Sequence, residues 1–191
     1  EKVVVREDGT YEIGRLSPDV EDPIYGKTYL PRKFKIGLAA DFDNSVDVYT
    51  QDIGIIAVTE NGSILGYEVL AGGGLGYTHR KPDTYARAAT HLTFVTEDEL
   101  MPILETIVKV QRDHGGRANR RYARLKYLID EWGWVKFEAT VWEYAGKKYA
   151  APRGVKPSDQ PDYLGWHKQI QPGLNYVGVW IENGRIRDFE G

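Results

Sequence analysis

The sequence contains no cysteine. Without thiols the chain forms no disulfide, carries no thiolate nucleophile or Cys-x-x-Cys redox pair, and offers an iron–sulfur cluster none of its ordinary ligands. Long apolar runs are also missing, because stretches such as 53–58 are far shorter than the roughly 20 residues that a membrane-spanning helix needs. We therefore expect a soluble protein, with no membrane partner, whose own side chains perform no thiol chemistry.

An excess of charge of either sign is lacking as well, since 25 Lys and Arg stand against 28 Asp and Glu and the isoelectric point is near 5.9. This balance gives no overall attraction to nucleic acid or anionic lipid, so any anion site must come from a local cluster. With 191 residues, 41% of them apolar, the chain is long enough for one domain and part of a second. Because it begins at Glu1 rather than Met, we expect a fragment or a processed product.

The β-rich segments lie mainly in the first half of the chain. A short hairpin is predicted from residues 3–5 and 11–13, which flank an Asp-Gly turn. A strand is predicted over 35–40, and a longer hairpin over 53–70 with an Asn-Gly turn at 61–62.

Three helices are predicted after these strands. Thr96 and Glu99 have the spacing of a capping box, and an apolar stripe then predicts a helix over 96–114. A second helix is predicted over 119–132, with its first residue as N-cap, and a third over 135–144.

Prolines at 152, 157 and 161 indicate a domain boundary. We expect one domain over 1–157 and the opening strands of a second α+β unit over 158–191. In that second unit the sequence predicts a strand over 176–181, a turn, and a return strand from Ile186.

The segment 31–35 is the first candidate for binding chemistry. In a strand, the side-chain period of two places Lys33 and Lys35 on one face and Arg32 with Phe34 on the other. Two neighbouring ammonium groups repel each other unless an anion lies between them, which makes the pair a candidate anion site. The alternative, which spacing alone favours, is a solvated edge strand protected by lysine.

The second candidate is a cluster of arginines around the start of the predicted second helix. A helix N-terminus carries positive potential, so guanidinium groups there form an anion receptor. The alternative is a surface helix whose arginines pair with nearby acids, and the two readings are evenly matched. The cluster comprises Arg112, Arg117, Arg120, Arg121 and Arg124.

Two further patterns exclude common sites. The run 72–76 matches neither G-x-G-x-x-G nor a P-loop, so a nucleotide site is not expected. The four histidines show no close metal-ligand spacing, and we assign no metal to them.

Seven further motifs follow one another along the chain. They are YLPRKFK (29–35), DNSVD (43–47), QDIG (51–54), GGGLG (72–76), QRDHG (111–115), RRYARLKY (120–127) and YLGWH (163–167). Taken together, in order and spacing, they resemble the motifs of the sirohaem sulfite and nitrite reductases, from about residue 23 to the end. The last motif, with the segment IENGRI (181–186), favours the sulfite branch.

This resemblance implies an α+β fold, with a mixed sheet, helices packed on one of its faces, and the start of a second repeat. It also implies a six-electron reduction of sulfite to sulfide at a sirohaem coupled to a 4Fe-4S cluster, with electrons from ferredoxin or a flavoprotein. The cluster's cysteine ligands would lie outside this chain. The expected location is the cytoplasm, or the plastid in a plant or alga.

By position in the motifs, Lys33 and Lys35 match the family's substrate-binding lysines. Arg32 and Arg124, and with a weaker match Arg120, correspond to residues that meet the sirohaem carboxylates or the bound anion. The backbone of Gly72, Gly73 and Gly74 is expected to lie against the macrocycle.

Two alternatives stay open from the sequence. One is a ferredoxin-type nitrite reductase of the same family, which would use the same cations on a smaller anion. The other is a non-enzymatic module that binds anions or nucleic acid, which the negative net charge and the lack of aromatic residues interleaved with the arginines disfavour. As part of a sulfite reductase, the 191 residues alone are not expected to reduce sulfite.

Overall fold

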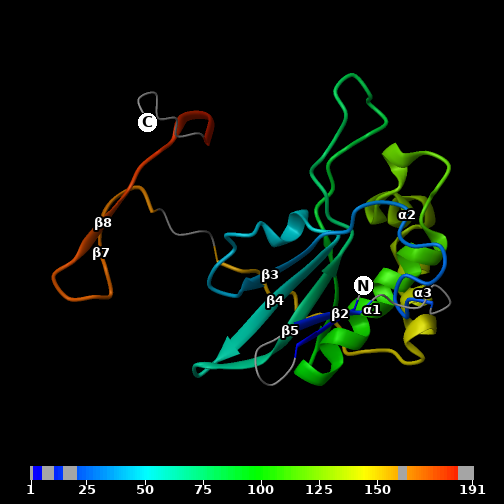
Figure 1. Ribbon diagram of the computed structural model, residues 1–191, viewed down its shortest axis with the longest axis horizontal. Coiled ribbons are helices and arrows are strands. Elements are labelled where there is room, and N and C mark those ends of the chain that lie inside the picture. The colour runs from blue at the N-terminus through cyan, green and yellow to red at the C-terminus, as the bar shows by residue number, and fades with distance from the viewer. Residues whose placement is uncertain (1, 6–10, 15–20, 159–162, 185–191) are drawn as a thin grey trace.

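The computed structural model describes residues 2–5, 11–14, 21–158 and 163–184. Its centre is a mixed four-stranded sheet in the order β3-β4-β5-β6 (Figure 1). β3 runs parallel to β4, whereas β4–β5 and β5–β6 are antiparallel. The strands are β3 (Ile36–Ala40), β4 (Ile53–Glu60), β5 (Ser63–Ala71) and β6 (Thr90–Val95).

The β4–β5 hairpin is confirmed as the sequence predicts. Asn61 and Gly62 both have positive φ, 52° and 79°, which is the backbone that a tight two-residue hairpin turn needs. Glu60 pairs with Ser63 across this turn. The predicted first hairpin is also present, as β1 (Lys2–Val5) paired with β2 (Tyr11–Gly14).

The three α-helices lie on one side of the sheet, with α1 against the strands and α2 and α3 packed against α1 (Figure 1). α1 spans Glu97–His114 behind the Thr96 capping box, and α3 spans Trp134–Ala145 and ends at Gly146 in the left-handed conformation, φ 67°. α2 is the shorter helix Leu125–Trp132. The mixed sheet with helices on one face is therefore confirmed.

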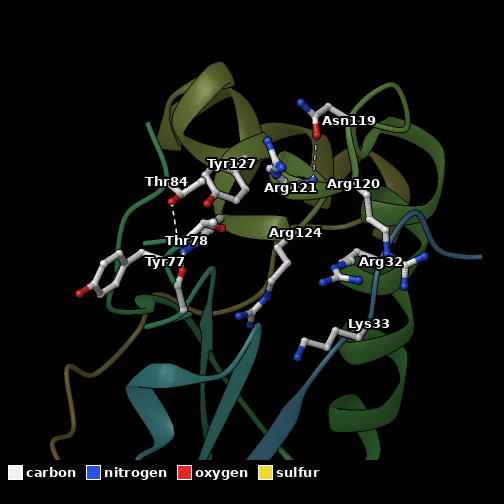
Figure 2. Close-up of a pocket in the computed structure, with 12 residues that line it drawn as sticks. Arg32, Lys33, Tyr77, Thr78, Thr84, Asn119, Arg120, Arg121, Arg124 and Tyr127 are labelled. Atoms are coloured by element: carbon white, nitrogen blue, oxygen red, sulfur yellow. Dashed lines mark hydrogen bonds between the residues drawn. The ribbon is translucent and has the colours of Figure 1, made fainter. Parts of the chain in front are cut away.

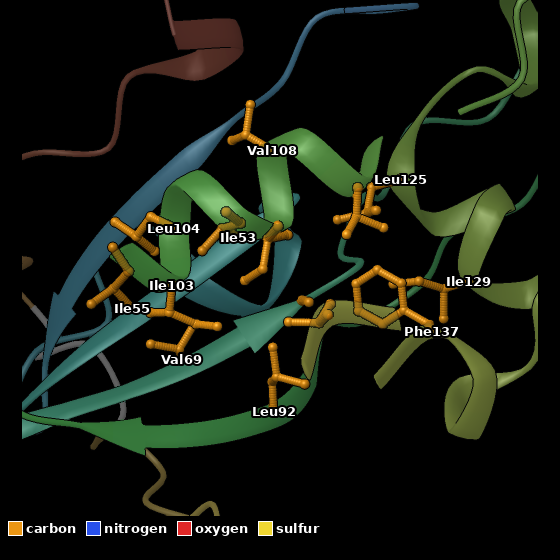
Figure 3. Packing of buried hydrophobic residues seen from close by; sticks show 14 of the residues in the cluster. Ile53, Ile55, Val69, Leu92, Ile103, Leu104, Val108, Leu125, Ile129 and Phe137 are labelled. Atoms are coloured by element: carbon orange, nitrogen blue, oxygen red, sulfur yellow. The ribbon is translucent and has the colours of Figure 1, made fainter. Parts of the chain in front are cut away.

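The main core lies between these helices and the sheet (Figure 3). Its buried side chains come from the helix stripe that the sequence predicts and from β4, β5 and β6, so burial of one apolar face fixes each helix on the sheet. Members of this core include Ile53, Val69, Leu92, Ile103, Ile107, Leu125, Ile129 and Phe137.

The prediction of a single helix over 119–132 is wrong. Asn119 does act as an N-cap, accepting the Arg121 N–H, but of a 3-10 turn at Arg120–Tyr122 (η2). α2 then begins at Leu125, with Arg124 in extended conformation, φ −80° and ψ 156°, as its N-cap. The arginines of this region thus project from a turn and a helix start, not from one helix face.

The opposite face of the sheet carries a smaller cluster formed by Ala39, Val48, Ile56, Leu70 and Ala89. The 3-10 turn η1 (Val48–Thr50) contributes to it. On the same side of β5, the buried carboxylate of Glu68 accepts the backbone N–H groups of two residues after α3, Arg153 at 3.0 Å and Gly154 at 2.8 Å.

A third hairpin, near the C-terminus, lies apart from the main sheet (Figure 1). It pairs β7 (Gly165–Lys168) with β8 (Asn175–Gly178), and η3 (Glu182–Gly184) follows it. The predicted strand 176–181 is thus shorter and pairs with a preceding segment. The predicted return strand from Ile186 lies outside the described residues, and the domain limits at 157 and 158 stay predictions. Among the helices of the described ranges, none has the length and apolar character to cross a membrane.

Candidate anion site

A cavity of about 600 Å³ opens where the segment before β3 passes the start of α2 (Figure 2). We call it the basic cavity, because six of the residues that line it are Arg or Lys and none is acidic. The cations are Arg32, Lys33, Arg120, Arg121, Arg124 and Lys126. The other lining residues are Gly76, Tyr77, Thr78, Thr84, Asn119 and Tyr127.

Three segments that are distant in sequence supply this lining. Residues 32–33 precede β3, residues 76–84 belong to the loop after β5, and residues 119–127 include η2 and the start of α2. Figure 2 shows Lys33, Arg32 and Arg124 on facing segments of this cavity. The structure therefore brings Arg32, Lys33, Arg120 and Arg124 together, as the sequence predicts.

Lys35 is placed differently from the prediction. It is exposed, but it is not among the residues that line the basic cavity, whereas its neighbours Arg32 and Lys33 both are. Arg32 and Lys33 were expected on opposite faces of a strand, but both line the cavity, and β3 begins only at Ile36. Phe34 packs against the main core.

Arg124 is held by a carboxylate that the sequence analysis did not single out. Its Nε donates to Oδ1 of Asp52 at 3.1 Å and its Nη2 to Oδ2 at 2.8 Å. The Asp52 side chain is 0% exposed and that of Arg124 is 12% exposed. Such a bidentate, charge-assisted pair fixes the plane of the guanidinium. Asp52 lies in the QDIG motif (51–54), but no role was assigned to it from the sequence.

Lys126 is a second buried cation in the cavity lining, with 1% exposure. Its Nζ donates to the carbonyl oxygens of Gly74 at 3.1 Å and Gly76 at 2.9 Å, and also to that of Tyr85. Burial lowers the pKa of Lys126. Three carbonyl acceptors nevertheless require all three N–H donors of the ammonium form, so we assign Lys126 as charged.

Four cations of the basic cavity have free side chains within the described part of the chain. Arg32, Lys33, Arg120 and Arg121 make no side-chain hydrogen bond or ion pair to any other described residue. Their donors are available for an anion, which is how a preformed cationic site is arranged.

The other two arginines of the predicted cluster have a different role. Arg112 pairs with Asp113 at 2.6 Å and donates to the Ile24 carbonyl at 2.7 Å. Arg117 donates to the Tyr29 carbonyl at 2.7 Å. Neither lines the basic cavity, so the reading of five arginines as one receptor is wrong: these two fasten the connector before β3 to α1 and the loop after it.

The glycine run is buried in protein rather than lining the cavity. An added Cβ would come within 2.5 Å of Ile129 Cδ1 at Gly72, 2.3 Å of the Tyr49 carbonyl oxygen at Gly73, and 2.7 Å of Arg124 Nη1 at Gly74. Close packing inside the chain therefore requires glycine at these positions. Gly76, with open space around it, is the glycine that lines the cavity.

Comparison with known proteins agrees with this architecture. The family model described as "Nitrite and sulphite reductase 4Fe-4S domain" matches residues 5–149. The sulfite reductase [NADPH] hemoprotein beta-component of Shewanella sp. (strain W3-18-1) is 44% identical over 191 residues, which is 100% of this chain and 32% of that protein. The sulfite reductase [ferredoxin] of Synechococcus elongatus is 46% identical over 176 residues, 92% of this chain and 28% of that protein.

Among solved structures, the Mycobacterium tuberculosis NirA protein matches with a TM-score of 0.59 and 27% identity, covering 79% of this chain and 27% of that one. This chain thus spans about a third of the length of the curated relatives that it matches. The family model alone covers more than half of the chain. The chain belongs to the nitrite and sulphite reductase family.

Proposed function

We propose that this chain forms the anion-binding part of a sulfite reductase haemoprotein, which reduces sulfite to sulfide with six electrons. The observation that carries the proposal is the basic cavity, in which six cations and no acid converge. Relatives at 44% and 46% identity are named sulfite reductases, which supports sulfite over nitrite as the substrate.

The residues present fit one of the two expected prosthetic groups. Sirohaem carries several carboxylates, and the free guanidinium groups of Arg32, Arg120 and Arg121 are suited to bind them in bidentate fashion. Arg124 has less to offer, because its Nε and Nη2 are already engaged by Asp52. Bound there, sirohaem would supply the redox chemistry, while the protein supplies orientation and electrostatics.

The 4Fe-4S cluster does not fit this chain. The sequence has no cysteine, and the described residues include no group of three His, Cys, Asp or Glu arranged to hold a metal. If the complete enzyme holds such a cluster, its ligands belong to other parts of the protein.

Lys33 is proposed to bind and orient the sulfite anion, with Lys35 as its neighbour on the same segment. The Lys33 ammonium group would lower the energy of the bound anion and of the negative charge that develops on it during reduction. Reduction also consumes protons as the sulfite oxygens leave as water, and a lysine ammonium is a proton donor.

The proposed function also requires a protein that donates electrons. The similar proteins include one named for NADPH and one named for ferredoxin, so we propose a ferredoxin or a flavoprotein as partner. A location in the cytoplasm, or in the plastid of a plant or alga, follows from the same proposal.

The test is Lys33→Met in the complete enzyme, with sulfite kinetics and sirohaem absorbance as readouts. A hydrogen bond to a charged group contributes about 1.5 to 3 kcal/mol, so kcat/KM for sulfite should fall roughly tenfold to a hundredfold while sirohaem content stays unchanged. Lys109→Met is the control, because Lys109 pairs with Glu105 on α1 and does not line the basic cavity. Unchanged sulfite kinetics in Lys33→Met would refute the proposed site, and faster turnover of nitrite than of sulfite would favour the nitrite reductase alternative.

A further inference from the structure

Asp52 joins three segments at the base of the basic cavity. Its Oδ2 accepts hydrogen bonds from the Lys35 N–H, at 2.9 Å, and from Nη2 of Arg124, at 2.8 Å. Its Oδ1 accepts a hydrogen bond from Nε of Arg124 at 3.1 Å. Its backbone carbonyl accepts the Gly72 N–H at 2.8 Å. The segment before β3, the glycine run and the N-cap of α2 therefore meet at one residue.

We infer that Asp52 is a positioning residue for the anion site: it fixes the distance between the lysine segment and the arginine at the start of α2. The inference deepens the proposed function and depends on it. Asp52 itself does not line the cavity, so it acts through Lys35, Lys33 and Arg124.

Asp52 can position these segments because its carboxylate is fully buried and both of its oxygens accept hydrogen bonds. A buried carboxylate is stable only when paired, so Asp52 holds the guanidinium in one plane with Nε and Nη2 turned inward. The Lys35 backbone is bound to the same carboxylate, which fixes the path of the chain at Lys33, two residues earlier. A shift of one segment against the other would change the spacing of the cations around a small anion.

Positioning and simple electrostatics predict opposite results when Asp52 loses its charge. Asp52→Asn removes a negative charge beside a cationic cavity, and by charge alone it should tighten anion binding. If Asp52 positions the cations, the same change should weaken binding, since the amide cannot accept both guanidinium N–H groups and would present a donor to Arg124.

The experiment uses the complete haemoprotein, with sulfite as the probe. We expect Asp52→Asn to raise the sulfite KM by between about tenfold and about a hundredfold, the size of effect that a displacement of about 1 Å can cause. The same loss of affinity should appear at equilibrium, when sulfite is titrated against the haem absorption spectrum. Glu68→Gln is the matched control, because Glu68 is an equally buried carboxylate that accepts two backbone N–H groups but does not line the cavity. It should lower the melting temperature and leave sulfite affinity unchanged.

A double-mutant cycle with Lys33→Met separates positioning from general destabilisation. If Asp52 acts through the lysine segment, the double variant should lose less affinity than the product of the two single effects. Independent effects that multiply, or a lower KM in Asp52→Asn, would overturn the inference. Should Asp52→Asn yield no folded haemoprotein, Arg124→Lys keeps the charge, removes the bidentate fork, and must raise the sulfite KM for the inference to stand.

The outcomes also distinguish this inference from the proposed function. If Lys33→Met keeps normal sulfite kinetics, the anion site itself is wrong, whatever Asp52 does. If Lys33→Met weakens sulfite binding and Asp52→Asn does not, only the positioning role fails.

Discussion

Replacing Arg124 by Met should destabilise the fold as well as change the cavity. The side chain is mostly buried, and it is the only side chain among the described residues that forms an ion pair with Asp52. Removing it leaves a carboxylate with 0% exposure beside an apolar thioether, and within the described ranges the Lys35 N–H is the one remaining donor to that carboxylate. Arg124→Met therefore tests the stability of the fold before it tests binding. Any loss of sirohaem in this variant would partly result from the destabilised fold.

The magnitude follows from the burial of the pair. Breaking a buried ion pair by removing one partner costs about 3 to 5 kcal/mol, because the remaining charge is uncompensated. Since domains of this kind are stable by only about 5 to 15 kcal/mol, this is a large part of the total free energy of unfolding. Arg124→Lys keeps a cation near Asp52 and should cost clearly less.

Urea unfolding of the 191-residue chain, followed by circular dichroism, measures this difference. Arg120→Met is the control, because Arg120 lines the same cavity but its side chain contacts no acid in the described part of the chain. We expect Arg120→Met to change the unfolding midpoint little. The reasoning is refuted if Arg124→Met unfolds at the midpoint of the unmodified chain, or if Arg120→Met is equally destabilising.

Three further outcomes are expected from the same chain. Thr96→Ala removes the capping box of α1 and should lower the free energy of unfolding by about 1 kcal/mol in the same urea assay. Burial and the hydrogen bond to Asp130 raise the pKa of Tyr85 to about 12 from its ordinary 10.0, so the stability that this neutral phenol contributes is present below pH 10 and lost as the pH rises toward 12. Tyr85→Phe should therefore flatten the alkaline fall in melting temperature, and an unchanged slope would contradict the assignment. The purified 191-residue chain should produce no sulfide from sulfite with reduced methyl viologen, because it has no cysteine to hold the cluster, and sulfide above a no-protein control would contradict this.

Local sequence patterns were sufficient to predict most of the fold. The β4–β5 hairpin depends on two residues at its turn, and α1 on a capping box followed by an apolar stripe, so each signal lies within a few residues of the element that it specifies. The helix predicted over 119–132 failed because Asn119 caps a 3-10 turn as readily as an α-helix. What breaks the helix is the extended backbone of Arg124, whose side chain reaches Asp52, 72 residues earlier in the chain.

The cations of the site could be predicted from sequence motifs. Residues whose role depends on contacts with distant segments could not. Lys33, Arg120 and Arg124 were identified by motif, and the structure places all three at one cavity. Asp52 and Lys126 were not selected, because each is bonded to residues of distant segments, and such contacts leave no periodic pattern in the sequence. Lys126 is recognised only from the three carbonyl oxygens that surround its ammonium group.

The same partners explain how a chain of negative net charge keeps a positively charged cavity. A cation placed beside an acid would contribute little potential, and Arg112 is neutralised in this way by Asp113, outside the cavity. Lys126 is stabilised instead by carbonyl dipoles, which satisfy its donors without cancelling its charge. Asp52 forms its ion pair with Arg124 behind the lining, and no acid lines the cavity among the described residues. The anion preference that we propose would therefore result from where the acids are placed, and a carboxylate added to the lining should weaken it, as removing a lysine should.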